Sequence, residues 1–129
     1  SSKHDYLLVY SKDSSNYKFN VDDIERIPYM APGLVTPEKE SQGKLPTDTW
    51  FDRPQLEDVL KRIIKASTDP ADIVLDCFAS STSVSTTASE LKRRFILLCN
   101  DLSASVVFRH KYARDPLVQW LGELSSSHT

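Results

Sequence analysis

Two short apolar runs decide the fold of this chain, Ile73-Val74-Leu75-Asp76 and Phe95-Ile96-Leu97-Leu98-Cys99. Such runs are typical of buried strands. Because the first run does not alternate with polar residues, we expect a central parallel strand that is covered on both faces. Residues 80–94, between the two runs, carry an apolar stripe at helical spacing and are expected to form a helix. Strand, helix, strand predicts a βαβ unit with a parallel sheet, and therefore an α/β fold.

Helices are expected on both sides of this unit. Residues 54–67 place a row of aliphatic side chains on one face, with Pro54 in the first turn and Asp52 as a possible cap. Residues 102–113 are expected to form another helix. A last one should follow Asp115-Pro116, with an apolar face of Leu117, Trp120, Leu121 and Leu124.

The N-terminal part of the chain has a different character. Tyr6-Leu7-Leu8-Val9-Tyr10 reads as a buried strand that joins the sheet. Residues 11–53 are polar and proline-rich, so we expect an irregular segment with one helical turn near residues 21–26. A connection this long is a functional loop, a linker or a disordered segment. We therefore divide the chain into residues 1–53, a βαβ region over 54–124, and a frayed tail over 125–129.

Composition excludes several classes of function. The formal net charge of −2 lacks the basic excess of chains that bind nucleic acid by phosphate attraction alone. Cys77 and Cys99 lie in apolar runs and are expected to be reduced, buried thiols of a cytoplasmic protein. No apolar run approaches the roughly 18 residues of a membrane span, and no signal peptide opens the chain. The histidines have no metal-ligand spacing with the cysteines, and there is no Gly-x-Ser-x-Gly elbow, so neither a metal site nor a serine hydrolase is expected.

Five stretches, taken in order, point to a known family. They are Gly43-Lys44-Leu45-Pro46-Thr47-Asp48-Thr49-Trp50, Arg62-Ile63-Ile64-Lys65-Ala66-Ser67, Asp72-Ile73-Val74-Leu75-Asp76, Phe78-Ala79 and Leu91-Lys92-Arg93-Arg94-Phe95. Together they resemble the C-terminal half of the beta-class DNA amino-methyltransferases, a group that includes modification subunits of type III restriction systems. The opening residues, Asp5 to Lys12, also resemble the strand that closes the catalytic half of these enzymes. The resemblance implies a partial Rossmann-like sheet with parallel strands and flanking helices. It also implies methyl transfer from S-adenosylmethionine to the exocyclic amine of a flipped adenine or cytosine in DNA.

The cofactor loop of that family reads Asp, then Pro or Phe, then Phe, a small residue and Gly-Ser-Gly-Thr. Here the corresponding residues are Asp76-Cys77-Phe78-Ala79-Ser80-Ser81-Thr82-Ser83. The resemblance assigns cofactor contacts to Asp76, Phe78, Ala79, Ser80 and Thr82. Ser80 and Thr82 replace the glycines, which permit φ > 0 and let a ligand lie against the backbone. A β-branched Thr82 at such a position is expected to be strained and to weaken cofactor binding. The alternative for Asp76 is that it caps the following helix.

Two further positions of the family's site differ in this chain. Relatives end the next strand with an acid that accepts the ribose hydroxyls, and this place falls on Cys99, whose thiol is a poor acceptor. Asp101, two residues later, is the candidate replacement, with a helix cap before Leu102 as the alternative. The Pro-Pro-aromatic motif that holds the target amine is absent, so no catalytic residue is assigned. The segment 51–53 is also shorter than in relatives, and Trp50 is expected to pack the long loop onto the body.

Two basic clusters have two interpretations. Lys92-Arg93-Arg94 and Arg109-His110-Lys111 with Arg114 can contact DNA phosphates, but a solvated helix face is the favoured interpretation.

Two functional hypotheses follow. In the first, the chain is the cofactor half of a restriction–modification DNA methyltransferase acting on adenine N6 or cytosine N4, weak or inactive on its own. In the second, it is a non-enzymatic binding or assembly module that acts with a partner protein or DNA. Unpaired sheet edges lead us to expect either a homo-oligomer or a partner chain that carries the catalytic half.

Overall fold

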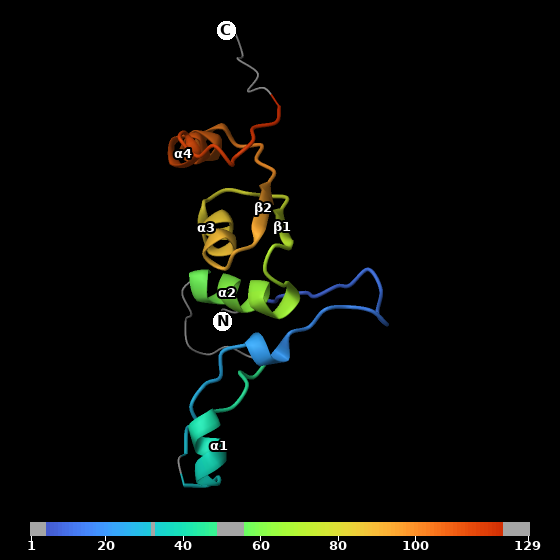
Figure 1. Ribbon diagram of the computed structural model, residues 1–129, viewed down its shortest axis with the longest axis vertical. Helices are drawn as coiled ribbons and strands as arrows, with labels where there is room; N and C mark the ends of the chain where they lie inside the picture. Colours follow the sequence, from blue (N-terminus) through green and yellow to red (C-terminus); the bar gives the residue numbers. More distant parts are fainter. Residues whose placement is uncertain (1–4, 32, 49–55, 123–129) are drawn as a thin grey trace.

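The computed structural model describes residues 5–31, 33–48 and 56–122, which form an elongated α/β molecule (Figure 1). Along the chain the elements are η1 (Val21–Asp23), α1 (Pro37–Gln42), α2 (Leu56–Ser67), β1 (Ile73–Asp76), α3 (Ser83–Glu90), β2 (Arg94–Leu97) and α4 (Leu102–Tyr112). Helix α1 lies at one end and α4 near the other, with α2, α3 and the two strands between them. The predicted α/β class, with parallel strands and flanking helices, is confirmed.

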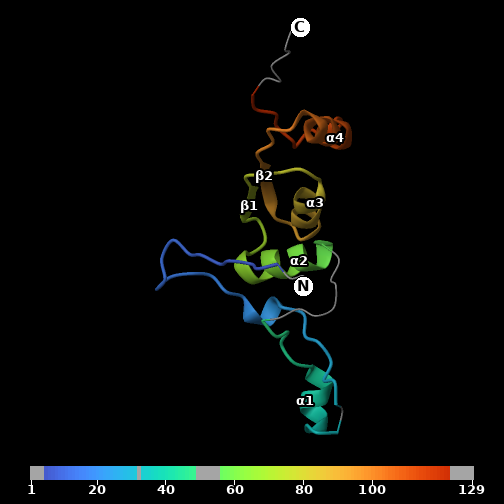
Figure 2. The ribbon, with the colours of Figure 1, turned by 180° about the vertical axis from the view of Figure 1, so that it is seen from behind.

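The sheet consists of β1 and β2, which run parallel with Ile73 opposite Arg94 and Asp76 opposite Leu97. Helix α3 connects the two strands. In both views it lies on one side of the strand pair (Figures 1 and 2). The predicted strand–helix–strand unit is therefore formed, with strand boundaries within two residues of those expected.

Only one face of this sheet is covered by the described residues. Burial alternates along both strands, so every second side chain points away from α3. The side chains on this open face are 47–55% exposed: Ile73, Leu75, Ile96 and Leu98. The predicted burial on both faces is wrong, because α3 supplies one covering layer and the described residues supply no second one. The exposed Cys77, which follows β1, corrects the expectation of a buried thiol.

Helix α3 forms although Ser and Thr, which are weak helix formers, dominate it. Ser85, Thr87 and Ala88 are almost completely buried, and α3 packs against both α2 and β2. Their small side chains let the neighbouring backbones approach closely. The hydroxyls of Ser85 and Thr86 donate to the carbonyl of Thr82 at 3.0 and 2.7 Å, so their polarity is satisfied locally. Tertiary packing therefore overrides the low intrinsic propensity.

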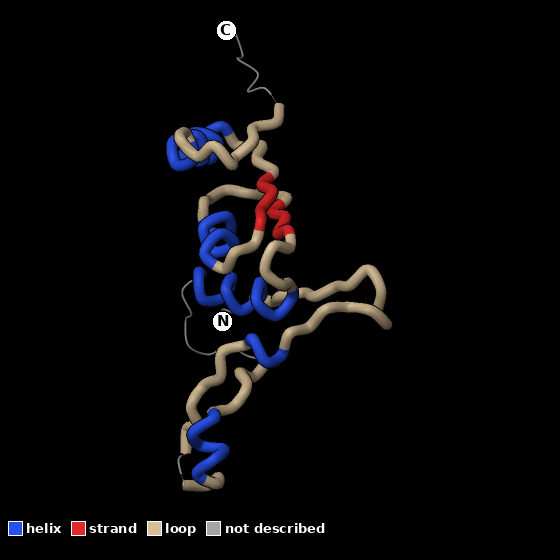
Figure 3. The backbone as a smooth tube through the Cα atoms, viewed as in Figure 1, coloured by secondary structure: helices blue, strands red, loops and turns tan. Residues whose placement is uncertain are grey.

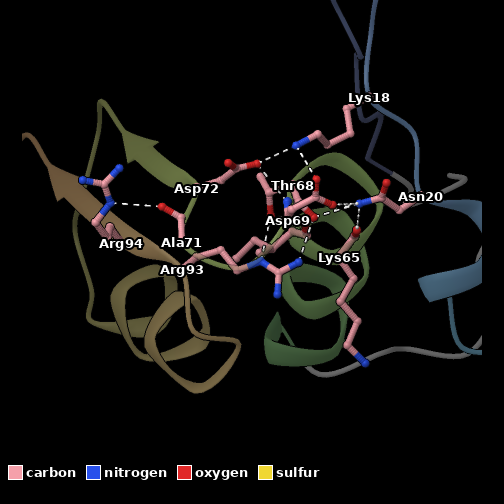
Figure 4. Close-up of polar contacts among 10 residues, drawn as sticks. Lys18, Asn20, Lys65, Thr68, Asp69, Ala71, Asp72, Arg93 and Arg94 are labelled. Atoms are coloured by element: carbon pink, nitrogen blue, oxygen red, sulfur yellow. Dashed lines mark hydrogen bonds and ion pairs between the residues drawn. The ribbon is translucent and has the colours of Figure 1, made fainter.

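Arg93 holds the junction between α2, α3 and the sheet (Figure 4). Its guanidinium donates to the Thr68 hydroxyl (Nε–Oγ1, 3.0 Å), the Thr68 carbonyl (Nη2–O, 2.7 Å) and the Leu91 carbonyl (Nη1–O, 2.7 Å). The residue is only 9% exposed. The predicted solvated face is thus wrong for Arg93, because its side chain lies where two helix ends leave backbone carbonyls without helical partners.

The segment before η1 is anchored to the end of α2, as Figure 4 shows. Lys18 Nζ lies 2.6 Å from the Asp69 carboxylate and 2.9 Å from that of Asp72. The Asn20 amide donates to the Thr68 carbonyl and to Asp69 Oδ1, both at 2.9 Å. The Lys18 ammonium lowers the pKa of Asp69, whereas the pKa of Asp72 is lowered first by the Asp69 backbone N–H and then by Lys18. This part of the predicted irregular stretch is therefore tied to the body.

Two predicted elements are not formed in the described residues. Residues 6–10 belong to no strand and run past α2 as an open loop (Figure 3), since the two-stranded sheet does not extend to them. Residues 116–122 form one turn at 116–117 and then an irregular segment instead of a helix, with Leu117 89% and Leu121 94% exposed. An amphipathic helix needs a surface that covers its apolar face, and Leu117 and Leu121 of the predicted face are not covered by the described residues.

One helix was not predicted. Helix α1 begins at Pro37, a favoured first-turn residue, and ends at Gln42, with Gly43 as its C-cap at φ +72°. An antiparallel bridge between Ile27 and Lys44 closes the arm that carries it. The turn predicted near residues 21–26 is confirmed as η1. The predictions for Trp50, the segment 51–53, the Pro54 turn with its Asp52 cap, Leu124 and the tail 125–129 lie outside the described residues.

Candidate cofactor site at the carboxyl ends of the strands

Two loops meet at the carboxyl ends of β1 and β2, where the βαβ pattern predicts a ligand edge. The Leu98 N–H donates to the Asp76 carbonyl at 2.8 Å, and the Ala79 N–H donates to the Leu98 carbonyl at 3.0 Å. The loop after β1 and the residues after β2 therefore lie side by side.

Asp76 and Phe78 remain accessible in this arrangement. Asp76 is half-buried, and its Oδ1 accepts the Phe78 N–H at 3.0 Å, which closes a tight turn directly after β1. The alternative that Asp76 caps α3 is wrong, because Thr82 holds the cap position of that helix. The Phe78 ring is 90% exposed, so it offers a free aromatic surface beside the loop.

Ala79 is buried, in contrast to its neighbours in the loop. It is 3% exposed and forms a small core with Ala104 and Phe108 of α4, against which Leu97 and Cys99 pack. A ligand that contacts Ala79 must therefore displace the face of α4. The role of this face was missed from the sequence. The sequence does contain a signal for this face. Ala104, Phe108 and Tyr112 are spaced four residues apart, and such residues lie on one side of a helix.

Helix α4 is also tied to α3. The Tyr112 hydroxyl donates to the buried Ser85 Oγ at 2.6 Å, and the Tyr112 ring lies 5.5 Å from that of Phe95. Lys111 donates to the hydroxyl of Thr86. These contacts hold α4 over the β1–α3 loop.

The two residues in place of the family glycines adopt ordinary conformations. Thr82 has φ −84° and ψ 2°, and among the described residues only Ala71 and Lys92 are non-glycine residues with positive φ. The expected strain at Thr82 is therefore absent, because the loop has settled into a backbone geometry that any L-residue can adopt. Ser80 is exposed, and Thr82 is half-buried.

Asp101 is the N-cap of α4. Its two carboxylate oxygens accept the backbone N–H groups of Ser103 (3.1 Å) and Ala104 (3.3 Å). The cap that was the alternative for Asp101 is thus present. The Cys99 thiol packs against the Ala79 core and donates to the Asp101 carbonyl, with Sγ and O 3.2 Å apart.

Comparison with known proteins bears directly on this site. The model of a DNA methylase family, the N6/N4 methyltransferases, matches residues 1–103. The chain belongs to this family. It is 33% identical over 117 residues to the DNA adenine methyltransferase YhdJ of Escherichia coli (strain K12), covering 74% of this chain and 40% of that protein. It is 46% identical over 43 residues to the Type II methyltransferase M1.MboII of Moraxella bovis, covering 33% and 16%. The chain thus spans less than half the length of these DNA methylase relatives.

Members of this DNA methylase family use S-adenosylmethionine and act on DNA, as the resemblance implied. Of the positions that the resemblance assigns to the cofactor, Asp76 and Phe78 are accessible, whereas others make contacts within the chain. Both carboxylate oxygens of Asp101 accept backbone N–H groups of α4. Position 99 is a cysteine in place of the family's acid, and Ala79 is buried under α4. In the same part of the chain, no group of three or more His, Cys, Asp or Glu residues can hold a metal ion. None of its helices has the length and apolar character to cross a membrane.

Proposed function

We propose that this chain is the cofactor half, over residues 54–124, of a DNA amino-methyltransferase of the beta class, and that it methylates weakly or not at all on its own. The observation that carries this proposal is the closure of α4 over the β1–α3 loop. Ala79 is buried under that helix, and both carboxylate oxygens of Asp101 cap it. Two of the six positions that the resemblance assigns to cofactor contacts, Ala79 and Asp101, are therefore engaged in contacts within the chain.

The chemistry of the site supports the same proposal. A ribose presents two adjacent hydroxyls, and an unengaged carboxylate can accept hydrogen bonds from both. Each oxygen of Asp101 already accepts one backbone N–H of α4, so fewer of its lone pairs remain for a ribose. Asp76 and Phe78 keep their place at the loop and could still contact the amino acid part and the adenine of a cofactor. Asp76 and Phe78 are accessible, but a thiol replaces the acid that accepts the ribose hydroxyls, and this combination favours weak cofactor binding.

The target of the parent reaction is the exocyclic amine of adenine or cytosine in DNA. This chain has no Pro-Pro-aromatic motif to hold that amine. Its relatives are more than twice as long as the part matched here. We propose that the chain acts as a homo-oligomer or together with a partner chain that carries the catalytic half, in the cytoplasm of a cell with a restriction–modification system.

Isothermal titration with S-adenosylmethionine and S-adenosylhomocysteine tests the proposal. We expect no binding at micromolar concentration in the wild type. Ser80→Gly/Thr82→Gly/Cys99→Asp restores the family's residues and should raise the affinity by about tenfold or more, because a new carboxylate gains hydrogen bonds to ribose. Micromolar binding by the wild type would contradict the proposal.

A matched control separates this gain from a general loosening of the loop. Ser81→Gly/Ser83→Gly/Cys77→Asp makes the same three kinds of change at neighbouring positions to which no cofactor contact is assigned. It should leave the affinity unchanged. An equal gain in both triple variants would mean that flexibility, and not the restored acceptor, controls binding.

One observation favours the second function, a non-enzymatic binding or assembly module. The open face of the sheet exposes four aliphatic side chains, as an interaction surface does. If the restored triple variant still binds no cofactor, this module becomes the better description. A methylation assay with radiolabelled S-adenosylmethionine and duplex DNA, with and without a separately expressed catalytic half, then decides between the two.

A further inference from the structure

The last turn of α4 and the residues that follow it carry three exposed cations, Arg109, Lys111 and Arg114. Helix α4 contains no acidic residue, and between residues 102 and 122 the chain has a single carboxylate side chain, that of Asp115. The end of α4 is therefore positive in a chain whose formal net charge is −2. Such a local excess of positive charge is typical of a surface that contacts phosphates.

Aromatic rings hold two of these cations in place. The Arg109 guanidinium carbon lies 4.9 Å from the centre of the Trp120 ring. The Lys111 ammonium lies 5.5 Å from the centre of the Tyr112 ring. A guanidinium that stacks on a ring is attracted through its flat face and keeps the N–H groups at its edge available. Within the described part of the chain, the side chains of Arg109 and Arg114 make no hydrogen bond or ion pair, so their donors can reach a ligand.

The helix dipole does not account for the whole cluster. Cations in the last turn of a helix are stabilised by its negative end, which applies to Arg109 and Lys111. Arg114, however, follows the end of α4 at Tyr112. Trp120 reaches Arg109 from an irregular segment, and compensation of a dipole does not require that contact. An oriented guanidinium with available donors instead fits the recognition of an external anion.

The cluster lies at the same edge of the sheet as the candidate cofactor site. Helix α4 is placed beyond the carboxyl ends of β1 and β2 and packs on Ala79 of the β1–α3 loop (Figure 1). A DNA methyltransferase must bring its target base to the cofactor, so the duplex has to approach this edge. The family match ends at residue 103, so the three cations belong to a part of the chain that it does not cover.

We propose that Arg109, Lys111 and Arg114 form a contact surface for the phosphate backbone of duplex DNA, with Trp120 as a positioning residue for Arg109. The inference rests on the proposed function, in which DNA is the substrate, and it names a surface of this chain that holds the substrate. Phosphate contacts fix the position of a duplex but carry no sequence information. The surface therefore orients the DNA and does not select the recognition site.

Fluorescence anisotropy of the full chain with a labelled DNA duplex, without cofactor, tests this proposal. Three phosphate contacts contribute about −2.7 to the slope of log affinity against log salt, or about 40-fold between about 50 and about 200 mM. Arg109→Gln/Lys111→Gln/Arg114→Gln should make the slope shallower by that amount and weaken binding at low salt by about tenfold or more. The proposal is overturned if the wild type does not bind at about 1 mM protein, or binds a single strand more tightly than the duplex.

A matched triple variant removes the same charge elsewhere. Lys12→Gln/Arg26→Gln/Lys39→Gln replaces three exposed cations outside the cluster and gives the same net charge. Its affinity and salt slope should stay close to those of the wild type. Equal losses in the two triple variants would mean that binding follows net charge alone, and would overturn the proposal. Cofactor titration contains no DNA and this assay contains no cofactor, so failure of the surface and failure of the proposed function are distinguished.

Trp120→Leu tests the positioning of Arg109 without a change of charge. Loss of an exposed cation–π contact should lower the affinity by about two- to fivefold, and the salt slope should remain the same because all three charges are still present. Unchanged affinity would remove Trp120 from the proposal. Lys111 also donates to Thr86, so Arg109→Gln/Arg114→Gln, which keeps that bond, serves if the triple variant does not fold. It should reduce the slope by about 1.8, and an unchanged slope would overturn the proposed surface.

Discussion

Replacing Arg93 with methionine is the sharpest test of how this small core is held together. Methionine keeps an unbranched apolar stem and removes the guanidinium, which donates three hydrogen bonds while only 9% exposed. Bonds to charged groups contribute about 1.5–3 kcal/mol each, so a simple sum would exceed about 4 kcal/mol.

The surroundings of Arg93 reduce that value. The Thr68 carbonyl also accepts from the Asn20 amide at 2.9 Å, and the Thr68 hydroxyl donates to the Ile64 carbonyl at 2.6 Å. Both groups keep a partner after the substitution. Only the Leu91 carbonyl loses the side-chain bond that satisfies it. We therefore expect a loss of about 2–3 kcal/mol in the free energy of unfolding, a large share of the stability of a small domain.

Arg94→Met provides the matched control at the next residue. Arg94 is exposed and makes one side-chain bond, from Nε to the Ala71 carbonyl at 3.0 Å. Its loss should cost less than about 1 kcal/mol. Urea denaturation followed by circular dichroism, with the slope m held in common, measures both variants. Equal losses in the two variants would refute the argument, because burial would then have no effect. Full stability in Arg93→Lys would attribute the effect to charge near Asp72 instead of the guanidinium's bonds.

Three further predictions follow from local geometry. Asp101→Ala removes the cap of α4 and should cost about 1 kcal/mol in urea denaturation, with Asp101→Asn nearly neutral, since an amide oxygen can still accept. Lys18→Met should lower stability near neutral pH, and the gap to wild type should close as pH falls below 3.8, the ordinary carboxyl pKa. The sign follows because the pKa values of Asp69 and Asp72 are lowered in the folded state, so their contribution is present above that value and lost as they protonate; a gap that widens in acid would contradict it. Lys92→Gly should raise the thermal midpoint, because Lys92 has φ +61° and glycine relieves about 1 kcal/mol of left-handed strain.

The elements that were predicted correctly depend on local signals. Strands β1 and β2 are short apolar runs, and α2 and α4 carry apolar side chains at helical spacing or a capping acid. Such signals act over a few residues and need no partner. The strand expected over residues 6–10 has the same local signal but depends on a sheet edge within reach. The described residues place none beside it, so an identical pattern gave no strand.

Burial was harder to predict than secondary structure, because it depends on which surfaces meet. The run Ile73-Val74-Leu75 is equally apolar at every position, and nothing in it distinguishes the covered Val74 from its half-exposed neighbours. Arg93 shows the reverse case. A cationic residue in a basic triplet is normally solvated, and it becomes buried here because Thr68, 25 positions earlier, brings a carbonyl and a hydroxyl to it.

At the candidate site, too, the sequence motif was predictable, whereas the packing around it was not. The loop over residues 76–82 identifies ancestry from sequence, and the family match confirms it. What Asp101 can offer a ligand depends on α4, because each of its two oxygens already accepts a backbone N–H of that helix. Releasing Asp101 for a ligand costs about the 1 kcal/mol of an N-cap, and uncovering Ala79 costs further apolar burial. Under the proposed function, a cofactor that contacts Ala79 must open α4, and the free energy of that opening is subtracted from its binding free energy.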